Sequence, residues 1–260
     1  MKTLEKMSFS KSLQIILPFV FYIIFALFMI YQIVQAKTIL IKIILLLLSV
    51  LILGVALYSE YLKYLYRKAI KIITIDLNPE KAMQEFDHLL KKDVFHAYKN
   101  DKKIFDTLYY MDQMQYKECL NHLQENYKFF HSSADQLLIY HYTNFYCSYM
   151  VDDYATAQSE YNKLERMRNT KVKGIRISPL YNWEFMDGLY LMSRKDYKQS
   201  LNVFKSVNTQ NMNLREKVQY YYHFAQLCSK IKDKNLKKHY VHEMKELHGS
   251  SNICLKGVNL

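Results

Sequence analysis

The sequence predicts an all-α protein in which two membrane-spanning helices precede a larger domain of helical hairpins. Two long apolar stretches lie close together near the N-terminus. The whole chain of 260 residues has only 5 glycines and 3 prolines, which argues against a turn-rich sheet protein. Small and large apolar residues recur at helical spacing through the rest of the chain, which indicates helices.

The first apolar stretch, residues 12–36, contains no charged residue. As a helix it is longer than the ~30 Å hydrocarbon core at ~1.5 Å per residue. Pro18 stands near its beginning, where a missing backbone donor is tolerated. The alternative is a cleaved secretory signal with Val34 and Ala36 before the cleavage point, but the apolar region is too long for a signal peptide.

The second apolar stretch, residues 39–58, has Lys42 as its only charged residue, near enough to its start for the ammonium to reach the headgroups. The connection QAKT leaves room only for a tight turn, so the two stretches predict an antiparallel hairpin. Lys and Arg flank its outer ends more heavily than the connection, which predicts that both termini are cytoplasmic. The cations concerned are Lys2, Lys6 and Lys11 before the hairpin and Lys63, Arg67, Lys68 and Lys71 after it.

Residues 59–77 continue as a basic and aromatic juxtamembrane helix. Tyrosines at the membrane interface and cations just inside it are the expected anchor. We therefore expect Lys63, Arg67, Lys68 and Lys71 to lie at the membrane surface, either as an ordinary positive flank or as a specific lipid site. Frequent Lys, Ile, Asn and Tyr indicate a bacterial plasma membrane protein from an AT-rich genome.

Four segments that begin at Asn78, Met114, Asp152 and Lys195 share a helix-opening pattern. In each, a small or modest residue is followed four positions later by a larger one. The pairs are Ala82 and Phe86, Cys119 and Leu123, Ala157 and Tyr161, and Ser200 and Phe204.

This pattern resembles the second helix of a tetratricopeptide (TPR) repeat. The segment 195–207 is the closest match, and Gly188 stands twelve residues before Ser200, where the family has its glycine. Thr107 and Phe145 replace that glycine in other repeats, and Trp183 is one position off. The resemblance covers about residues 75–248 and implies a TPR-like α-solenoid with a concave face. The first helices of the pairs are expected at about 102–112, 134–150, 178–193 and 214–230.

In this family the first helix of each pair lines the concave groove, and the resemblance implies an apolar, tyrosine-rich groove for a protein or peptide ligand. The alternative is that the same side chains fill the core or are covered by the protein itself. The implied groove residues are Ile104, Leu108, Tyr142, Tyr146, Tyr149, Phe185, Leu189 and Tyr221, with Met111, Ile139, Asn182, Met192 and Phe224 at equivalent positions.

Two further segments are predicted to lack regular structure. Residues 168–179 are polar and include Gly174, which predicts a loop. Gly249 is a predicted helix stop, after which residues 249–260 are predicted to be a flexible tail. The predicted domains are a cytoplasmic N-terminus (1–11), two transmembrane helices (12–58), the juxtamembrane helix (59–77), a TPR-like cytoplasmic domain (78–248) and the tail (249–260).

No pattern in the sequence predicts a catalytic residue, a cofactor or a metal. The four cysteines are widely spaced, which fits reduced thiols. His239, His242, Glu243 and His248 match no zinc motif and are interpreted as a solvated helix face. Adjacent Asp152 and Asp153 are explained by helix capping.

The net charge of +12 does not point to nucleic acid, because acidic residues are interspersed with the basic ones and no reading motif is present. Attraction to the anionic inner leaflet accounts for the excess. The leading functional hypothesis is a membrane-anchored adaptor or scaffold that binds a protein or peptide at the cytoplasmic face. The alternative is a peptide-responsive membrane regulator or sensor, and the third is a membrane-bound enzyme of unrecognised class. Oligomeric state is not predicted.

Overall fold

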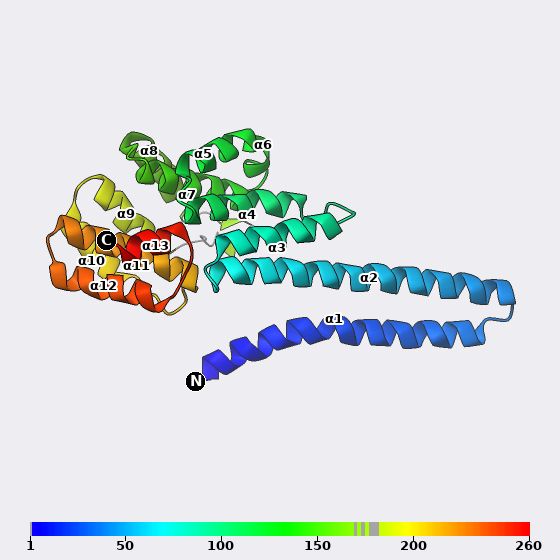
Figure 1. Ribbon diagram of the computed structural model, residues 1–260. Helices are drawn as coiled ribbons and strands as arrows, with labels where there is room; N and C mark the ends of the chain where they lie inside the picture. Colours follow the sequence, from blue (N-terminus) through cyan, green and yellow to red (C-terminus); the bar gives the residue numbers. More distant parts are fainter. Residues whose placement is uncertain (1, 169–170, 173–174, 177–181) are drawn as a thin grey trace. The chain divides into compact units, whose positions relative to one another are not determined.

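The computed structural model describes residues 2–168, 171–172, 175–176 and 182–260. Its contacts divide the chain into two compact units, Met1–Tyr64 and Leu65–Leu260. In the described residues the structure is all-α apart from one pair of two-residue strands, as the sequence predicts (Figure 1).

The unit Met1–Tyr64 consists of α1 (Lys2–Gln35) and most of α2 (Ile39–Thr74), joined by a three-residue connection. Leu17–Gln35 and Ile39–Thr74 are long and apolar enough to cross a membrane, judged by length and composition. Only 6% of the most apolar 18-residue window of each helix is buried, whereas the core helix of a water-soluble domain would bury one face. The hydroxyl of Tyr22 donates to Glu60 Oε1 at 3.3 Å.

The unit Leu65–Leu260 begins with residues 65–74 of α2 and continues as helices that mostly pack against their neighbours in sequence (Figure 1). They are α3 (Pro79–Lys92), α4 (Lys99–Asp112), α5 (Tyr116–Glu125), α6 (Tyr127–Phe130), α7 (Ala134–Met150), α8 (Tyr154–Met167), α9 (Trp183–Ser193), α10 (Tyr197–Ser206), α11 (Leu214–Lys230), α12 (Lys234–Glu246) and α13 (Asn252–Val258).

The predicted loop 168–179 contains a short antiparallel pair, β1 (Lys171–Val172) with β2 (Ile175–Arg176), in which Val172 is paired with Ile175. The remainder of that loop lies largely outside the described residues. The predicted first helices 134–150 and 214–230 coincide with α7 and α11. The helix expected at 178–193 is described from Trp183 onward.

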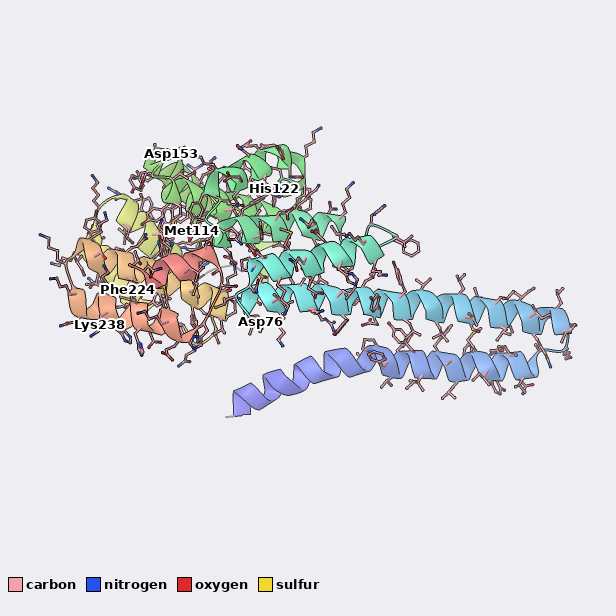
Figure 2. All side chains as sticks on the ribbon, in the orientation of Figure 1. Asp76, Met114, His122, Asp153, Phe224 and Lys238 are labelled. Carbon is pink, nitrogen blue, oxygen red and sulfur yellow. The ribbon has the colours of Figure 1, made fainter. Side chains whose placement is uncertain are left out.

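Four helical hairpins share one turn conformation. In each, the residue two positions after the end of the first helix has a positive φ, and the amide of the next residue donates to a carbonyl five positions earlier, at 2.8–3.0 Å. This is the 6→1 bond of a Schellman turn, which reverses the chain at a helix end. Figure 2 labels Met114 and Asp153 at two of the turns. The residues at positive φ are Met114, Asp152, Lys195 and Lys232, with φ of 57°, 62°, 62° and 62°.

The small residues that the repeat pattern singles out are where paired helices touch. Ala82, Cys119, Ala157 and Ser200 are each completely buried. The hydroxyl of Ser200 donates to the carbonyl of Gly188 at 2.9 Å, so α9 and α10 approach closely there. A Cβ atom at Gly188 would stand 2.6 Å from ring carbons of Phe204, a distance that real Cβ atoms do not adopt, so only glycine fits without a shift.

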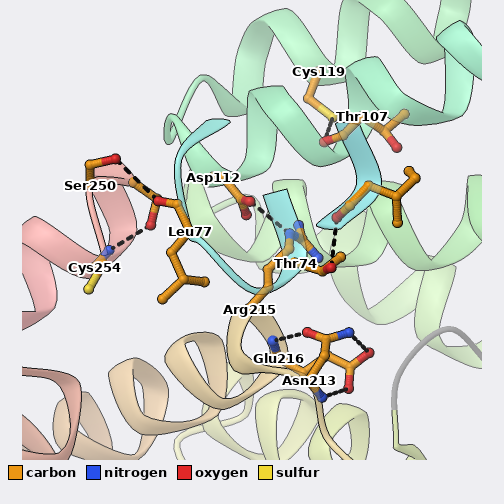
Figure 3. Close-up of polar contacts among 12 residues, drawn as sticks. Thr74, Leu77, Thr107, Asp112, Cys119, Asn213, Arg215, Glu216, Ser250 and Cys254 are labelled. Carbon is orange, nitrogen blue, oxygen red and sulfur yellow. Dashed lines mark hydrogen bonds and ion pairs between the residues drawn. The ribbon is translucent and has the colours of Figure 1, made fainter. Parts of the chain in front are cut away.

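Residues 249–260 are not a flexible tail, contrary to the sequence prediction. They contain α13, which packs against α11 and α12 and buries Ile253 and Cys254. The amide of Ser250 donates to the carbonyl of Leu77 at 3.1 Å, and Asn252 Nδ2 donates to the carbonyl of Gln113 at 3.1 Å (Figure 3 draws Ser250 beside Leu77). The segment was missed because its apolar residues are too few to show a helical period.

Candidate functional site

Most residues of the predicted groove lie in the core. Tyr142, Tyr146, Phe185 and Leu189 are at most 3% exposed and belong to one continuous apolar cluster, so they do not line an open groove. Tyr149 belongs to the same cluster and is 9% exposed.

The other three predicted groove residues are partly buried on separate helices. Ile104 packs beside Leu123 and Phe130, away from the central cluster. Leu108 is partly buried on α4. Tyr221 lies against Tyr240 of α12, with ring centroids 5.7 Å apart. The structure therefore does not bring the predicted set together as one surface.

Helix α11 explains why the groove is filled. It packs against α9, α10, α12 and α13, and its His223 reaches Tyr146 on α7 and Phe185 on α9. The centroids of the His223 and Phe185 rings are 5.8 Å apart. The first helices of the hairpins thus face one another, and their aromatic side chains occupy the space between them.

His223 is a completely buried, neutral imidazole. Its Nε2 lies 3.0 Å from the hydroxyl oxygen of Tyr146, and its Nδ1 lies 3.1 Å from Gln226 Oε1. Burial lowers the pKa of His223 to about 3, with the bond to Gln226 acting weakly in the other direction. Such a group stays uncharged at neutral pH and fixes the relative positions of α7 and α11.

A buried ion pair joins α4 to α11. Arg215 Nε donates to Asp112 Oδ2 at 2.8 Å, and both side chains are almost completely buried (Figure 3). Burial raises the pKa of Asp112, and Arg215 partly offsets that rise. Sequence reasoning missed this pair because 103 residues separate its members. No local pattern marked either residue, because Arg215 is followed by Glu216 and Lys217 and α4 carries several other charged residues.

One pocket reaches the surface where α7, α9, α11 and residues 249–260 meet, and we call it the α7–α11 pocket. Its volume is about 290 Å³. The floor is aromatic and apolar, whereas the rim carries exposed charged side chains. The lining residues are Tyr149, Met150, Asp152, Tyr154, Met192, Tyr222, Gln226, Ser229, Lys230, Lys256 and Leu260.

The tyrosines of this pocket are hydrogen-bond donors. Tyr149 donates to Met192 Sδ at 3.7 Å, and Tyr154 donates to Asp152 Oδ1 at 2.6 Å. Burial raises the pKa of Tyr149, and the bond to Asp152 raises the pKa of Tyr154 to about 12. Both phenols are therefore protonated at neutral pH and suited to binding.

No family model, no curated protein and no solved structure matches this chain.

The titratable residues that sequence reasoning considered are arranged for structure. In the described part of the chain, no group of three or more His, Cys, Asp or Glu side chains is placed to hold a metal ion. Asp153 caps α8 by accepting from the amide of Thr156 at 3.1 Å, and hydrogen bonds from the side chain and the amide of Thr156 lower the pKa of Asp153. All four cysteines are buried thiols. His242 is exposed and lies 3.9 Å from Glu246.

The four cations expected at the membrane surface are all exposed. Lys63 lies 2.8 Å from Glu60, one turn earlier on α2. Lys68 lies 2.7 Å from Glu85 of α3. Arg67 and Lys71 are four residues apart on α2, so their side chains lie on the same side of the helix.

Proposed function

We propose that this protein is a membrane-anchored adaptor whose helical domain binds a protein or peptide segment at the α7–α11 pocket. The main observation behind this proposal concerns α7, α9 and α11, each the first helix of a hairpin. Their ends converge on one surface pocket with an aromatic floor. Binding sites commonly combine such a floor with a few polar groups that orient the ligand.

A TPR-like repeat architecture supports the proposal. The four turns of shared conformation and the completely buried small residues recur at spacings near 40 residues, and one pair of helices approaches closely at Gly188. Arrays of this kind offer binding surfaces built from successive helices. In this protein the central space is filled by its own aromatic side chains, so we assign the binding role to the pocket that remains open.

The anchor is assigned to the two apolar helices, with both termini on the cytoplasmic side of a bacterial plasma membrane. Supporting this are the exposed apolar side chains of Leu17–Gln35 and Ile39–Thr74 and the cations that follow them. Anchoring restricts the search for a partner to the membrane surface and raises its local concentration.

The pocket chemistry suits a short segment with an apolar anchor residue and a charged neighbour. Met150, Tyr154 and Leu260 are the partly exposed side chains of the lining that can contact a ligand, above the buried Tyr149, Met192 and Tyr222. Lys230 and Lys256 stand at the rim and favour a carboxylate on the ligand, while Asp152 already accepts from Tyr154.

The direct test is photo-crosslinking in cells with the photoreactive side chain at Ser229 or Leu260, followed by mass spectrometry. These positions line the pocket and are accessible, so the fold should tolerate them. Tyr127 on α6, 48% exposed, is the matched control. We expect the same protein to be captured from both pocket positions. Its capture should be lost in the double variant Lys230→Glu/Lys256→Glu. Equal capture from Tyr127 would contradict the proposal.

One observation favours a regulator as the second candidate. Lys256 and Leu260, from the segment that contains α13, form part of the pocket wall, so a ligand there touches α13 directly. Exchange of the hairpin for an unrelated anchor separates the two candidates. An adaptor keeps its partner in a pull-down, whereas a regulator coupled through the hairpin loses its response.

A further inference from the structure

The loop between α3 and α4, residues 93–98, exposes two apolar side chains at its tip. Val94 is 73% exposed and Phe95 is 71% exposed. Within the described part of the unit Leu65–Leu260, no large apolar side chain is more exposed than these two. Adjacent exposed apolar residues on a soluble surface mark an interaction site more often than scattered single ones do.

The loop holds a defined conformation that keeps these side chains outward. The buried carboxylate of Asp93 accepts from the amide of Tyr98 at 2.7 Å. The amide of His96 donates to the carbonyl of Asp93 at 3.2 Å, and His96 has a φ of 54°. A non-glycine residue in the left-handed region is unfavourable, and such strain tends to persist at functional sites.

The charge around the tip is positive. Lys91, Lys92 and Lys99 flank the loop and are exposed. Asp93 is the acidic residue between them, and its carboxylate is turned inward. An apolar tip surrounded by cations is complementary to an anionic bilayer surface, where apolar side chains enter the acyl boundary and ammonium groups meet the phosphates.

The loop lies at the end of its unit where the chain enters from the apolar helices. Helix α3 runs antiparallel to residues 65–74 of α2, as the contact of Lys68 with Glu85 and the edge-to-face contact of Tyr66 with Phe86 require. After α3 turns back, the ring of Tyr98 comes within 5.2 Å of the ring of Tyr66. In the sequence, Tyr66 follows Tyr58, the last residue of the apolar run, by eight residues.

We propose that the α3–α4 loop is a second membrane contact, in which Val94 and Phe95 insert into the interface of an anionic bilayer while Lys91, Lys92 and Lys99 contact its headgroup phosphates. This inference rests on the proposed membrane anchor. It adds a lipid-binding surface that is separate from the partner pocket and from the cations of α2.

The test uses the full chain in vesicles with one tryptophan per variant. Trp183 is the single natural tryptophan and is replaced by Phe throughout. Phe95→Trp reports on the loop, Tyr127→Trp on an exposed aromatic position of α6, and Leu47→Trp on the middle of the apolar run of α2. Each variant is reconstituted in phosphatidylcholine with or without phosphatidylglycerol, and quenching by lipids brominated on the acyl chain is compared with quenching by aqueous acrylamide.

We expect the emission of Phe95→Trp to shift to shorter wavelength and to be quenched by brominated lipid, more strongly with phosphatidylglycerol present. Tyr127→Trp should respond to acrylamide alone. In the background Lys91→Glu/Lys92→Glu, the lipid quenching of Phe95→Trp should fall toward that of Tyr127→Trp. Val94→Trp provides a second reporter of the same insertion.

Two different outcomes would overturn the inference. If Leu47→Trp is quenched by brominated lipid but Phe95→Trp and Val94→Trp respond only to acrylamide, the anchor stands and the loop faces water or a protein partner. If Leu47→Trp is also not quenched, the anchor itself is wrong and the loop inference falls with it.

Discussion

The Nε2 atom of His223 on α11 lies 3.0 Å from the hydroxyl oxygen of Tyr146 on α7, although 77 residues separate them in the chain. Both side chains are completely buried, and the pair joins α7 to α11, the first helix of the last hairpin. Its consequence is a defined dependence of stability on pH.

Acidification should destabilise the protein through His223. Its pKa is about 3 in the folded state and near 6.5 when unfolded, so below pH 6.5 the unfolded chain binds one more proton. Stability from this group is complete above pH 6.5 and falls by up to ~1.4 kcal/mol per pH unit as pH drops toward 3. The free energy of unfolding, measured with urea between pH 5 and 7.5, should change less steeply with pH in His223→Gln than in the unsubstituted protein. The same substitution at exposed His242 should leave the slope unchanged; an equal slope in both variants would contradict the assignment.

Loss of either member of the Asp112–Arg215 pair should be severe. Asp112→Ala leaves the buried guanidinium without its carboxylate, and we expect a loss of about 3–5 kcal/mol in the free energy of unfolding. The double variant Asp112→Leu/Arg215→Met should lose much less than the sum of its single variants. Asp106→Ala, which removes the partner of Lys102 at a partly exposed site, should cost under about 1 kcal/mol. If the double variant lost as much free energy of unfolding as the two single variants together, the coupling between Asp112 and Arg215 would be ruled out.

Gly188→Ala should destabilise the contact of α9 with α10. The added methyl would meet the ring of Phe204 at 2.6 Å, and relief of such overpacking typically costs about 1–3 kcal/mol. Phe204→Leu, introduced together with Gly188→Ala, should recover part of that loss. For comparison, Gly54→Ala adds a methyl with no neighbour within 4 Å and should leave the unfolding of the helical domain unchanged. Thermal unfolding followed by circular dichroism makes the measurement.

Lys195→Gly should stabilise the protein. Lys195 has a φ of 62°, where a side chain is unfavourable, and glycine relieves about 1–2 kcal/mol of strain against an entropic cost of about 0.5–1 kcal/mol. A net gain of roughly 0.5–1 kcal/mol is expected from denaturant unfolding. Lys195→Val, which is branched at Cβ, should lower stability instead. If Lys195→Gly lowered stability as much as Lys195→Val, the positive φ assigned to residue 195 would be contradicted.

Local patterns were sufficient to predict much of the fold. The apolar runs predicted two long apolar helices, because length and the absence of charge are properties of a single stretch. The helices predicted at 134–150 and 214–230 from the repeat pattern are α7 and α11, and in the structure Ser133 and Asn213 cap them, each accepting from a backbone amide three positions later. The buried Ala157 and Ser200 followed from helical spacing.

The candidate site could not be predicted in the same way, because it depends on which helix faces meet. Helical spacing showed that Tyr142, Phe185 and Leu189 lie on apolar faces of their helices. Apolar residues at these positions fit both an open groove and a filled core, so the spacing does not distinguish the two arrangements. The α7–α11 pocket needs α13, whose burial depends on hydrogen bonds to Leu77 and Gln113 far away in the chain.

By itself, the sequence determined the helical class, the apolar hairpin segments and the positions where small residues let helices approach, since each depends on neighbours within a few turns. Only the tertiary structure decided that α11 closes the interior through His223 and Arg215, and that Val94 and Phe95 stand outside. The physical reason is that burial is a property of the assembled surface, and contacts between residues 77 or 103 positions apart leave no period in the chain.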